Sequence, residues 1–276
     1  PMELISQGKG NTDLISGYTS SSIGISEQIT LNVGVNAQVL TLNNSWTLEP
    51  RAGIKWQFSP KSSFALAYGL HSRMEKMDVY FVKTQGTGDR SVNKDLGFTR
   101  AHHVMLSYGF KISDNMNMKI EPYFQQLYDV PVIADSSYSV LNRRDFYVEN
   151  ALVNRGKGRN IGVDITLERY LNKGLYYMMT ASIFDSKYYG GDRKWRNTLY
   201  NRNFIVNVLG GKEWMVGRDR QNMFSVNFKI TLQGGDRYAP VDEVATLLDP
   251  DREVQYDETK AFSKQFSPMF ITNFSV

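Results

Sequence analysis

The sequence predicts an all-β fold in which long antiparallel strands follow one another as a meander, on three observations. First, apolar and polar residues alternate with a period of two, as in residues 46–58, where Trp46 and Ile54 take one parity and Glu49 and Lys55 the other. Second, the alternating segments are long, and third, the connections between them are short and long by turns. A transmembrane β-barrel combines these features, with apolar side chains outward in lipid and polar ones inward.

Eleven segments carry the alternation and are the predicted strands. Most have about ten to fifteen residues, whereas strands of ordinary sheets average about five or six, and a tilted strand needs about 9 to 11 residues to cross a bilayer. Strand length therefore favours membrane strands. The predicted strands are 12–25, 29–42, 46–58, 62–72, 98–112, 117–128, 157–170, 175–187, 200–215, 223–233 and 263–276.

The connections alternate in length along the chain. Turn-like segments rich in Ser, Pro, Gly, Asn and Asp lie at 26–28, 59–61, 113–116, 172–174 and 217–222. Between them lie the short 43–45 and the mostly long, polar segments 73–97, 129–156, 188–199 and 234–262. Outer-membrane barrels have short periplasmic turns and long extracellular loops. We therefore expect all the long connections on the extracellular side.

Aromatic residues make up 13% of the chain and recur beside the short turns. Amphipathic rings favour the headgroup level of a bilayer, so these residues are expected to form an interfacial girdle on the outer face. The predicted girdle residues are Trp56, Phe58, Phe64, Phe110, Tyr170, Tyr176, Trp214 and Phe224.

Composition removes several classes of protein and site. The chain has no cysteine, which excludes disulfides and thiolate metal sites. Its net charge of +4 is too small, and its basic residues too scattered, to argue for nucleic acid. No apolar run is long enough for a transmembrane helix. The chain starts at Pro1 without a signal-peptide pattern, and barrels of single bacterial chains have even strand numbers. We therefore expect it to be part of a longer protein.

Four motifs stand out as a set: "EPR" at 49–51, "FSPK" at 58–61, "NRGKGRNIGVD" at 154–164, and "SIFDSKY" followed by "NRNFIVNVLGGKEW" at 182–214. Together they resemble the barrel of TonB-dependent outer-membrane receptors of the Bacteroidetes type, and the resemblance covers essentially the whole chain. It implies that residues 1–276 form one partial barrel domain, about 11 strands of a 22-stranded barrel, without the N-terminal plug or the final strands.

The resemblance also implies a function. Such receptors sit in the outer membrane of Gram-negative bacteria and actively transport a scarce nutrient, which for this chain would be a siderophore, cobalamin, a glycan or a peptide. Its partners would be outer-membrane lipid, its own plug domain, a TonB-type energising complex reached through the N-terminal region, the nutrient and a surface lipoprotein, and no nucleic acid. No enzymatic activity and no cofactor are expected.

Charged residues on the polar parity of the predicted strands are candidates for contact with the plug. Positive and negative side chains are interspersed among them, as the wall of a water-filled barrel requires. The alternative to contact with the plug is that these charges are simply solvated in the lumen. The candidates are Glu49, Arg51, Lys55, Lys119, Glu121, Asp164, Glu168 and Lys229.

Aromatic residues in the long loops are candidates for capture of the nutrient. Rings beside Asp, Asn and Arg suit sugars, peptides and siderophores alike, and packing of one loop on another is the equal alternative. The ligand candidates are Tyr80, Phe81, Tyr138, Tyr189, Trp195 and Tyr238, with Phe146, Tyr147, Tyr188 and Tyr256 in the same loops.

Two other classes of function stay open from the sequence. His71 and His103 are expected near the mouth, facing the lumen, and His102 outward, so a metal pair or the site of a barrel hydrolase is conceivable, although no nucleophile elbow accompanies them. The third hypothesis is a soluble all-β binding protein.

The segment 156–162, "GKGRNIG", is rejected as a phosphate loop because it leads into a strand. The acidic "DPDRE" at 249–253 has too few ligands for calcium.

Overall fold

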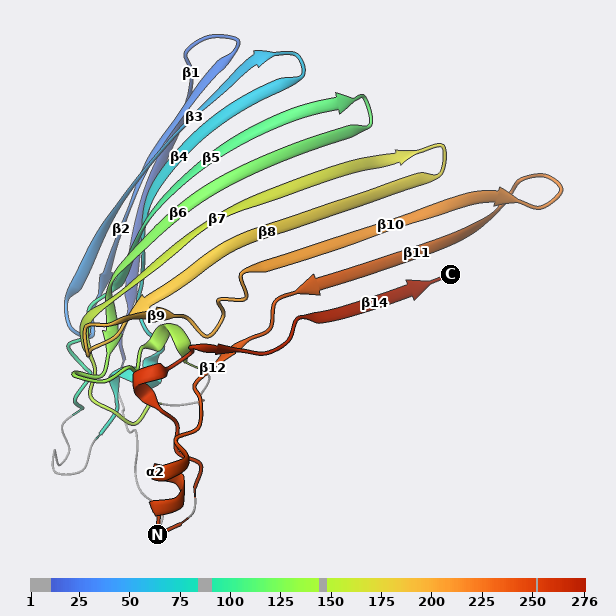
Figure 1. The fold of residues 1–276 in the computed structure, drawn as a ribbon. Helices are drawn as coiled ribbons and strands as arrows, with labels where there is room; N and C mark the ends of the chain where they lie inside the picture. The colour runs from blue at the N-terminus through green and yellow to red at the C-terminus, as the bar shows by residue number, and fades with distance from the viewer. Residues whose placement is uncertain (1–10, 84–90, 144–147, 252) are drawn as a thin grey trace.

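One large antiparallel sheet dominates the computed structural model, which describes residues 11–83, 91–143, 148–251 and 253–276. Eleven long strands lie side by side in chain order, and a short twelfth strand pairs with one of them (Figure 1). The long strands are β1 (Leu14–Gly24), β2 (Ile29–Leu40), β3 (Ser45–Ser59), β4 (Ser62–Arg73), β5 (Thr99–Ser113), β6 (Met116–Val132), β7 (Val153–Asn172), β8 (Leu175–Tyr189), β10 (Phe204–Val216), β11 (Asn222–Gln233) and β14 (Met269–Ser275).

The meander confirms the predicted strands, with one exception at the C-terminal end. The predicted strand 263–276 is two strands: β13 (Lys264–Gln265), which pairs with β12 (Arg237–Tyr238) outside the main sheet, and β14, which pairs with β11. Pro268 stands between them, and a proline has no amide hydrogen for a sheet ladder. The short β9 (Trp195–Asn197) extends the sheet beside β8.

The connections sort by length to the two ends of the sheet, as predicted (Figure 1). We call these ends the turn end and the loop end. The turn end carries the four short hairpin turns from β3 to β11 and the turn between β1 and β2. The loop end carries the long connections, including the helices α1 (Met77–Tyr80) and α2 (Glu243–Leu248) and the 3-10 turns Val140–Asn142 and Glu258–Lys260. No helix among the described residues is long and apolar enough to cross a bilayer.

The two faces of the sheet differ in polarity, because the register aligns residues of one kind across neighbouring strands. On β5, Leu106 pairs with Leu66 of β4, whereas Ser107 pairs with Ala65 on the opposite face. The apolar side chains of the long strands do not pack into a buried core: Ile54 is 40% exposed, and Leu106 and Phe228 are each 36% exposed. We call the two sides the apolar face and the polar face.

The girdle prediction fails for two of its eight residues. Tyr176 lies on the polar face, where its hydroxyl donates to Asn227 Oδ1 at 2.8 Å. Tyr170 also turns to that face and meets Asn117 through its hydroxyl at 3.3 Å. The other members are on the apolar face near the turn end, among them Trp214 and Phe224 with ring centroids 5.7 Å apart.

The buried apolar core of the described residues lies in the loops. Helix α1 contributes Val79 and Tyr80, both without exposed surface, and they cluster with buried side chains of β2, β6 and the neighbouring loops. The cluster contains Leu40, Val79, Tyr80, Val82, Leu96, Phe98, Val130, Val140, Val148 and Leu152. We call this packed region the loop cap.

Candidate functional site

All eight predicted wall residues lie on the polar face. The ladder places Arg51 beside Gly34 and Gly69, Glu121 beside Asp164, and Lys229 beside Leu209. Lys55, Lys119 and Glu168 line one hollow of about 630 Å³ together with Glu121. These charges therefore share one surface, although they come from strands far apart in the sequence.

The charges on the polar face are partly neutralised by their neighbours. Glu49 is only 1% exposed, and its carboxylate accepts from Gln38 Nε2 at 2.6 Å, Asn36 Nδ2 at 3.1 Å and the Arg51 guanidinium at 3.1 Å. Lys119 lies 2.8 Å from Glu121. Buried charge requires this saturation by donors, so Glu49 serves the wall itself, while half-exposed Arg51 and Lys119 remain accessible on the polar face.

A second hollow on this face, of about 480 Å³, lies nearer the loop end and is floored by small residues. Gly34, Gly53 and Ala67 stand in its floor, with His71 and His103 at its rim. A Cβ added to Gly69 would lie 2.7 Å from His71 Nε2, so the imidazole folds over the glycine. Small side chains leave the backbone open to close approach by another chain or a ligand.

The histidines take the predicted faces but form no hydrolytic or metal constellation in the described part of the chain. The rings of His71 and His103 are 6.3 Å apart, and neither ring bonds to a serine or a carboxylate there. His102 lies on the apolar face against the hydroxyl of Tyr68, at 2.9 Å. No group of three acidic or histidine side chains among these residues could hold a metal ion, and Asp249 accepts from the amides of Asp251 and Glu253.

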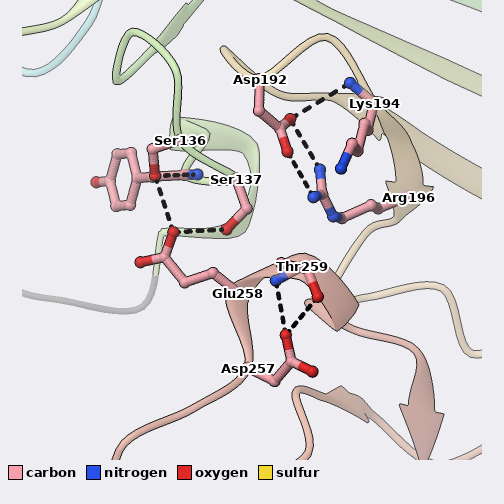
Figure 2. A network of polar contacts seen from close by, with 9 residues as sticks. Ser136, Ser137, Asp192, Lys194, Arg196, Asp257, Glu258 and Thr259 are labelled. Carbon is pink, nitrogen blue, oxygen red and sulfur yellow. Dashed lines mark hydrogen bonds and ion pairs between the residues drawn. The ribbon is translucent and has the colours of Figure 1, made fainter. Parts of the chain in front are cut away.

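Polar contacts join three long loops, part of which Figure 2 shows: the amide of Asp192, in the loop between β8 and β10, donates to the Ser136 carbonyl at 3.0 Å. Glu258, in the loop between β11 and β14, accepts from Ser136 at 3.2 Å and Ser137 at 3.5 Å in the loop between β6 and β7. In the loop between β8 and β10, both oxygens of Asp192 accept from Arg196, at 2.9 and 2.6 Å. Such bidentate pairs fix geometry as well as charge.

The charges in this network shift the acidity of its carboxyls. The Arg196 guanidinium, through its hydrogen bonds, lowers the pKa of Asp192. Hydrogen bonds from Thr259 and Lys260 lower the pKa of Asp257 to about 2. Both carboxylates are therefore ionised at neutral pH, and the network holds its charged form there.

We expect acid to loosen the segment 190–197, and Asp192→Asn to remove that response. Because the pKa of Asp192 is lower when folded than the ordinary value of about 3.9, its stabilisation is complete above that value and is lost as the pH falls through the lowered pKa. At neutral pH the substitution should cost about 1.5–3 kcal/mol of local stability. Hydrogen exchange of the amides in this segment measures it. Asp219→Asn, at an exposed turn, should change nothing there.

The predicted ligand residues fall into three environments. Tyr80 is fully buried and accepts from the Glu75 amide at 3.2 Å, so it packs the loop cap rather than facing a ligand. Phe81 and Tyr138 also pack against the cap. Tyr189 and Trp195 contact each other at 5.5 Å on the apolar face, away from the polar hollows. Phe146 and Tyr147 lie outside the described residues.

Two of these six keep exposed rings: Trp195, on the apolar face, and Tyr238, in the loop between β11 and β14. Tyr238 is 37% exposed and stacks on Phe266 with centroids 4.4 Å apart. Phe266, 58% exposed, was not predicted, because the sequence places it inside a strand. The pairing of β12 with β13 brings the two rings together, and Pro268 was the available signal that the strand breaks there.

Comparison with known proteins finds similar folds among solved structures but no match by sequence. No protein-family model matches the sequence, and no curated protein matches it either. Among solved structures, the chain is similar to the FrpB iron transporter of Neisseria meningitidis, with a TM-score of 0.61 and 14% identity over 95% of this chain and 38% of that one. It is also similar to the ferric-catecholate import receptor Fiu of E. coli K12, with a TM-score of 0.65 and 10% identity over 95% of this chain and 38% of that one.

A third similar structure is the ferripyoverdine receptor of the outer membrane of Pseudomonas aeruginosa, with a TM-score of 0.65 and 9% identity over 95% of this chain. The chain spans between 32% and 38% of the length of these three proteins. At this level of identity the comparison establishes the fold alone. The chain has the barrel-wall fold of TonB-dependent outer-membrane receptors.

Proposed function

We propose that this chain forms part of the wall and external loops of a TonB-dependent transporter in the outer membrane of a Gram-negative bacterium. The division of the sheet into an exposed apolar face and a charged polar face is the observation that supports this most strongly. Lipid covers the apolar face, water and the plug domain lie against the polar face, and the loop end is extracellular.

In this arrangement the polar face holds the plug. Arg51 and Lys119 are half-exposed and Glu168 is partly exposed, so charges of both signs are accessible, and the glycine-floored hollow gives a second chain room to approach the wall. The plug connects to the TonB-type energising complex, so uptake depends on energy from the inner membrane. A surface lipoprotein over the loops is a further partner to test.

The cargo is a scarce nutrient: a siderophore, cobalamin, a glycan or a peptide. Ferric siderophores are the first class to examine, because the similar structures are described as an iron transporter, a ferric-catecholate import receptor and a ferripyoverdine receptor. The exposed ring pair of Tyr238 and Phe266 suits the apolar part of such a ligand, and Arg237 and Asp236 adjoin it on the same loop.

The test is growth and uptake in a strain lacking the gene, supplied in turn with ferric siderophores, cyanocobalamin, oligosaccharides and peptides. We expect one class to require the gene and an uncoupler to abolish its uptake. Uptake that continues undiminished with the uncoupler, or a protein found outside the outer membrane, would contradict the proposal.

For the nutrient so identified, Tyr238→Ala in the full chain should raise the half-saturating concentration for uptake about tenfold, which corresponds to about 1.4 kcal/mol of lost binding. Trp195→Ala is the matched control, since Trp195 pairs with Tyr189 on the apolar face and should leave capture unchanged. Equal effects of the two substitutions would remove Tyr238 from the capture site.

A further inference from the structure

Three basic residues at the loop end of β7 point out of the polar interior. Arg155, Lys157 and Arg159 alternate with Gly156 and Gly158, and all three are exposed. The glycines face the loop cap: a Cβ on Gly156 would lie 3.2 Å from Val130 Cβ and would collide with the neighbouring Val132, and one on Gly158 would lie 3.0 Å from Leu141 Cδ1. Because successive residues of a strand point to opposite faces, the close packing of the cap directs the basic side chains outward.

These side chains directly border the apolar face. The next outward residue of β7 after Arg159 is Ile161, which is 51% exposed, and Ile183 of β8 is 64% exposed. Two residues of a strand span about 7 Å, so the positive charges begin within one side-chain length of the apolar band. Lys187 of β8 pairs with Arg159 in the register and adds a fourth charge to the row.

Two aromatic rings stand among these charges. Lys157 Nζ lies 5.7 Å from the ring centre of Tyr189, and the Arg159 guanidinium lies 5.6 Å from that of Trp195. Tyrosine and tryptophan at this height are typical of the headgroup level of a membrane. A ring satisfies one face of a cation but leaves its N–H groups free for an anion.

Acidic residues neutralise little of this patch. Asp185 lies 3.4 Å from Lys187, and within the described ranges no carboxylate forms an ion pair with Arg155, Lys157 or Arg159. Guanidinium groups bind phosphate oxygens in a bidentate manner, which suits a fixed phosphate at the membrane surface. Three cations without an ion-pair partner among the described residues, facing a lipid boundary, indicate an anionic headgroup as their partner.

We propose that Arg155, Lys157 and Arg159, with Lys187, form a binding site for the phosphate of an anionic glycolipid in the outer leaflet, whose acyl chains lie along Ile161 and Ile183. This inference rests on the proposed function, which places the loop end at the outer surface. The proposed site gives a function to the segment "GKGRNIG", which the sequence analysis rejected as a phosphate loop.

The experiment compares the full chain with two triple variants that each lose two arginines and one lysine. One carries Arg155→Gln, Lys157→Gln and Arg159→Gln. The control carries Lys61→Gln, Arg218→Gln and Arg220→Gln, at the exposed turn end. Outer-membrane fractionation comes first. Native mass spectrometry then counts phosphorylated glycolipid on the detergent-extracted proteins, and titrations use lipid A, dephosphorylated lipid A and inorganic phosphate.

We expect the wild type and the control to retain glycolipid and the β7 variant to bind lipid A at least tenfold more weakly. Dephosphorylated lipid A should bind the wild type at least tenfold more weakly as well, and millimolar inorganic phosphate should not displace lipid A. Equal retention by all three proteins, equal binding of the dephosphorylated lipid, or displacement by inorganic phosphate would overturn the site while leaving the transporter proposal intact. Absence of the wild type from the outer membrane would overturn both.

Discussion

Replacing Leu106 by lysine in the full chain is expected to destabilise the membrane-inserted barrel strongly. Leu106 lies at the middle of β5, 36% exposed on the apolar face beside Leu66. A lysine facing lipid at the bilayer midplane costs about 2–4 kcal/mol, a large share of the 5–15 kcal/mol by which proteins are typically stable. Refolding into lipid vesicles, followed by denaturant titration, measures the loss.

Ser107→Lys is the matched control, because it places the same charge one residue away on the polar face. Ser107 lines the larger polar hollow, where lysines already stand. We expect this variant to fold within about 1 kcal/mol of the wild type, as surface substitutions usually do. If the serine variant were the damaging one, the assignment of the two faces would have to be reversed.

Truncating Tyr80 to alanine is expected to open the loop cap. The side chain is fully buried at the centre of the cap, among Val79, Val82 and Leu96. Removing a large buried aromatic side chain typically costs about 3–5 kcal/mol, because the cavity refills only partly. Limited proteolysis of the loop between β4 and β5 should become at least tenfold faster, while the strands remain protected.

Tyr80→Phe separates packing from hydrogen bonding in the same position. It keeps the ring and loses only the hydroxyl that accepts from the Glu75 amide. Its expected cost is about 0.5–1.5 kcal/mol, so cleavage should rise only slightly. Rapid cleavage in the wild type, equal to that of the alanine variant, would show that the cap is not packed in solution.

The sequence was sufficient for the sheet because alternation and turn chemistry are local signals. Thirteen-residue patterns such as 46–58 locate β3 to within a residue at each end. The same reasoning started one strand four residues too late: the predicted strand 157–170 is the observed Val153–Asn172, because Gly156 and Gly158 hide the alternation at its beginning. Their apolar partners come from the loop cap, which the local pattern does not reveal.

The loops were not predictable because their contacts join distant residues. The amide of Leu152 donates to Asn93 at 2.7 Å, and Arg202 meets Asp236 at 2.7 Å, pairs separated by tens of residues. Tyr80 therefore looked like an exposed ring and is buried. The girdle prediction for Tyr176 failed for a different reason. Thr180 and Ser182 share the parity of Tyr176, so the sequence pattern itself assigns Tyr176 to the polar face.

Accessibility along β5 tests the orientation of the sheet most directly. The chain has no cysteine, so single cysteines from Val104 to Phe110 in the full chain, in native outer membranes, can each be challenged with a lipid-soluble and a water-soluble maleimide. The proposed orientation predicts that positions 104, 106, 108 and 110 react from the lipid phase and 105, 107 and 109 from water. The opposite pattern, or protection of the even positions from both reagents, would contradict it.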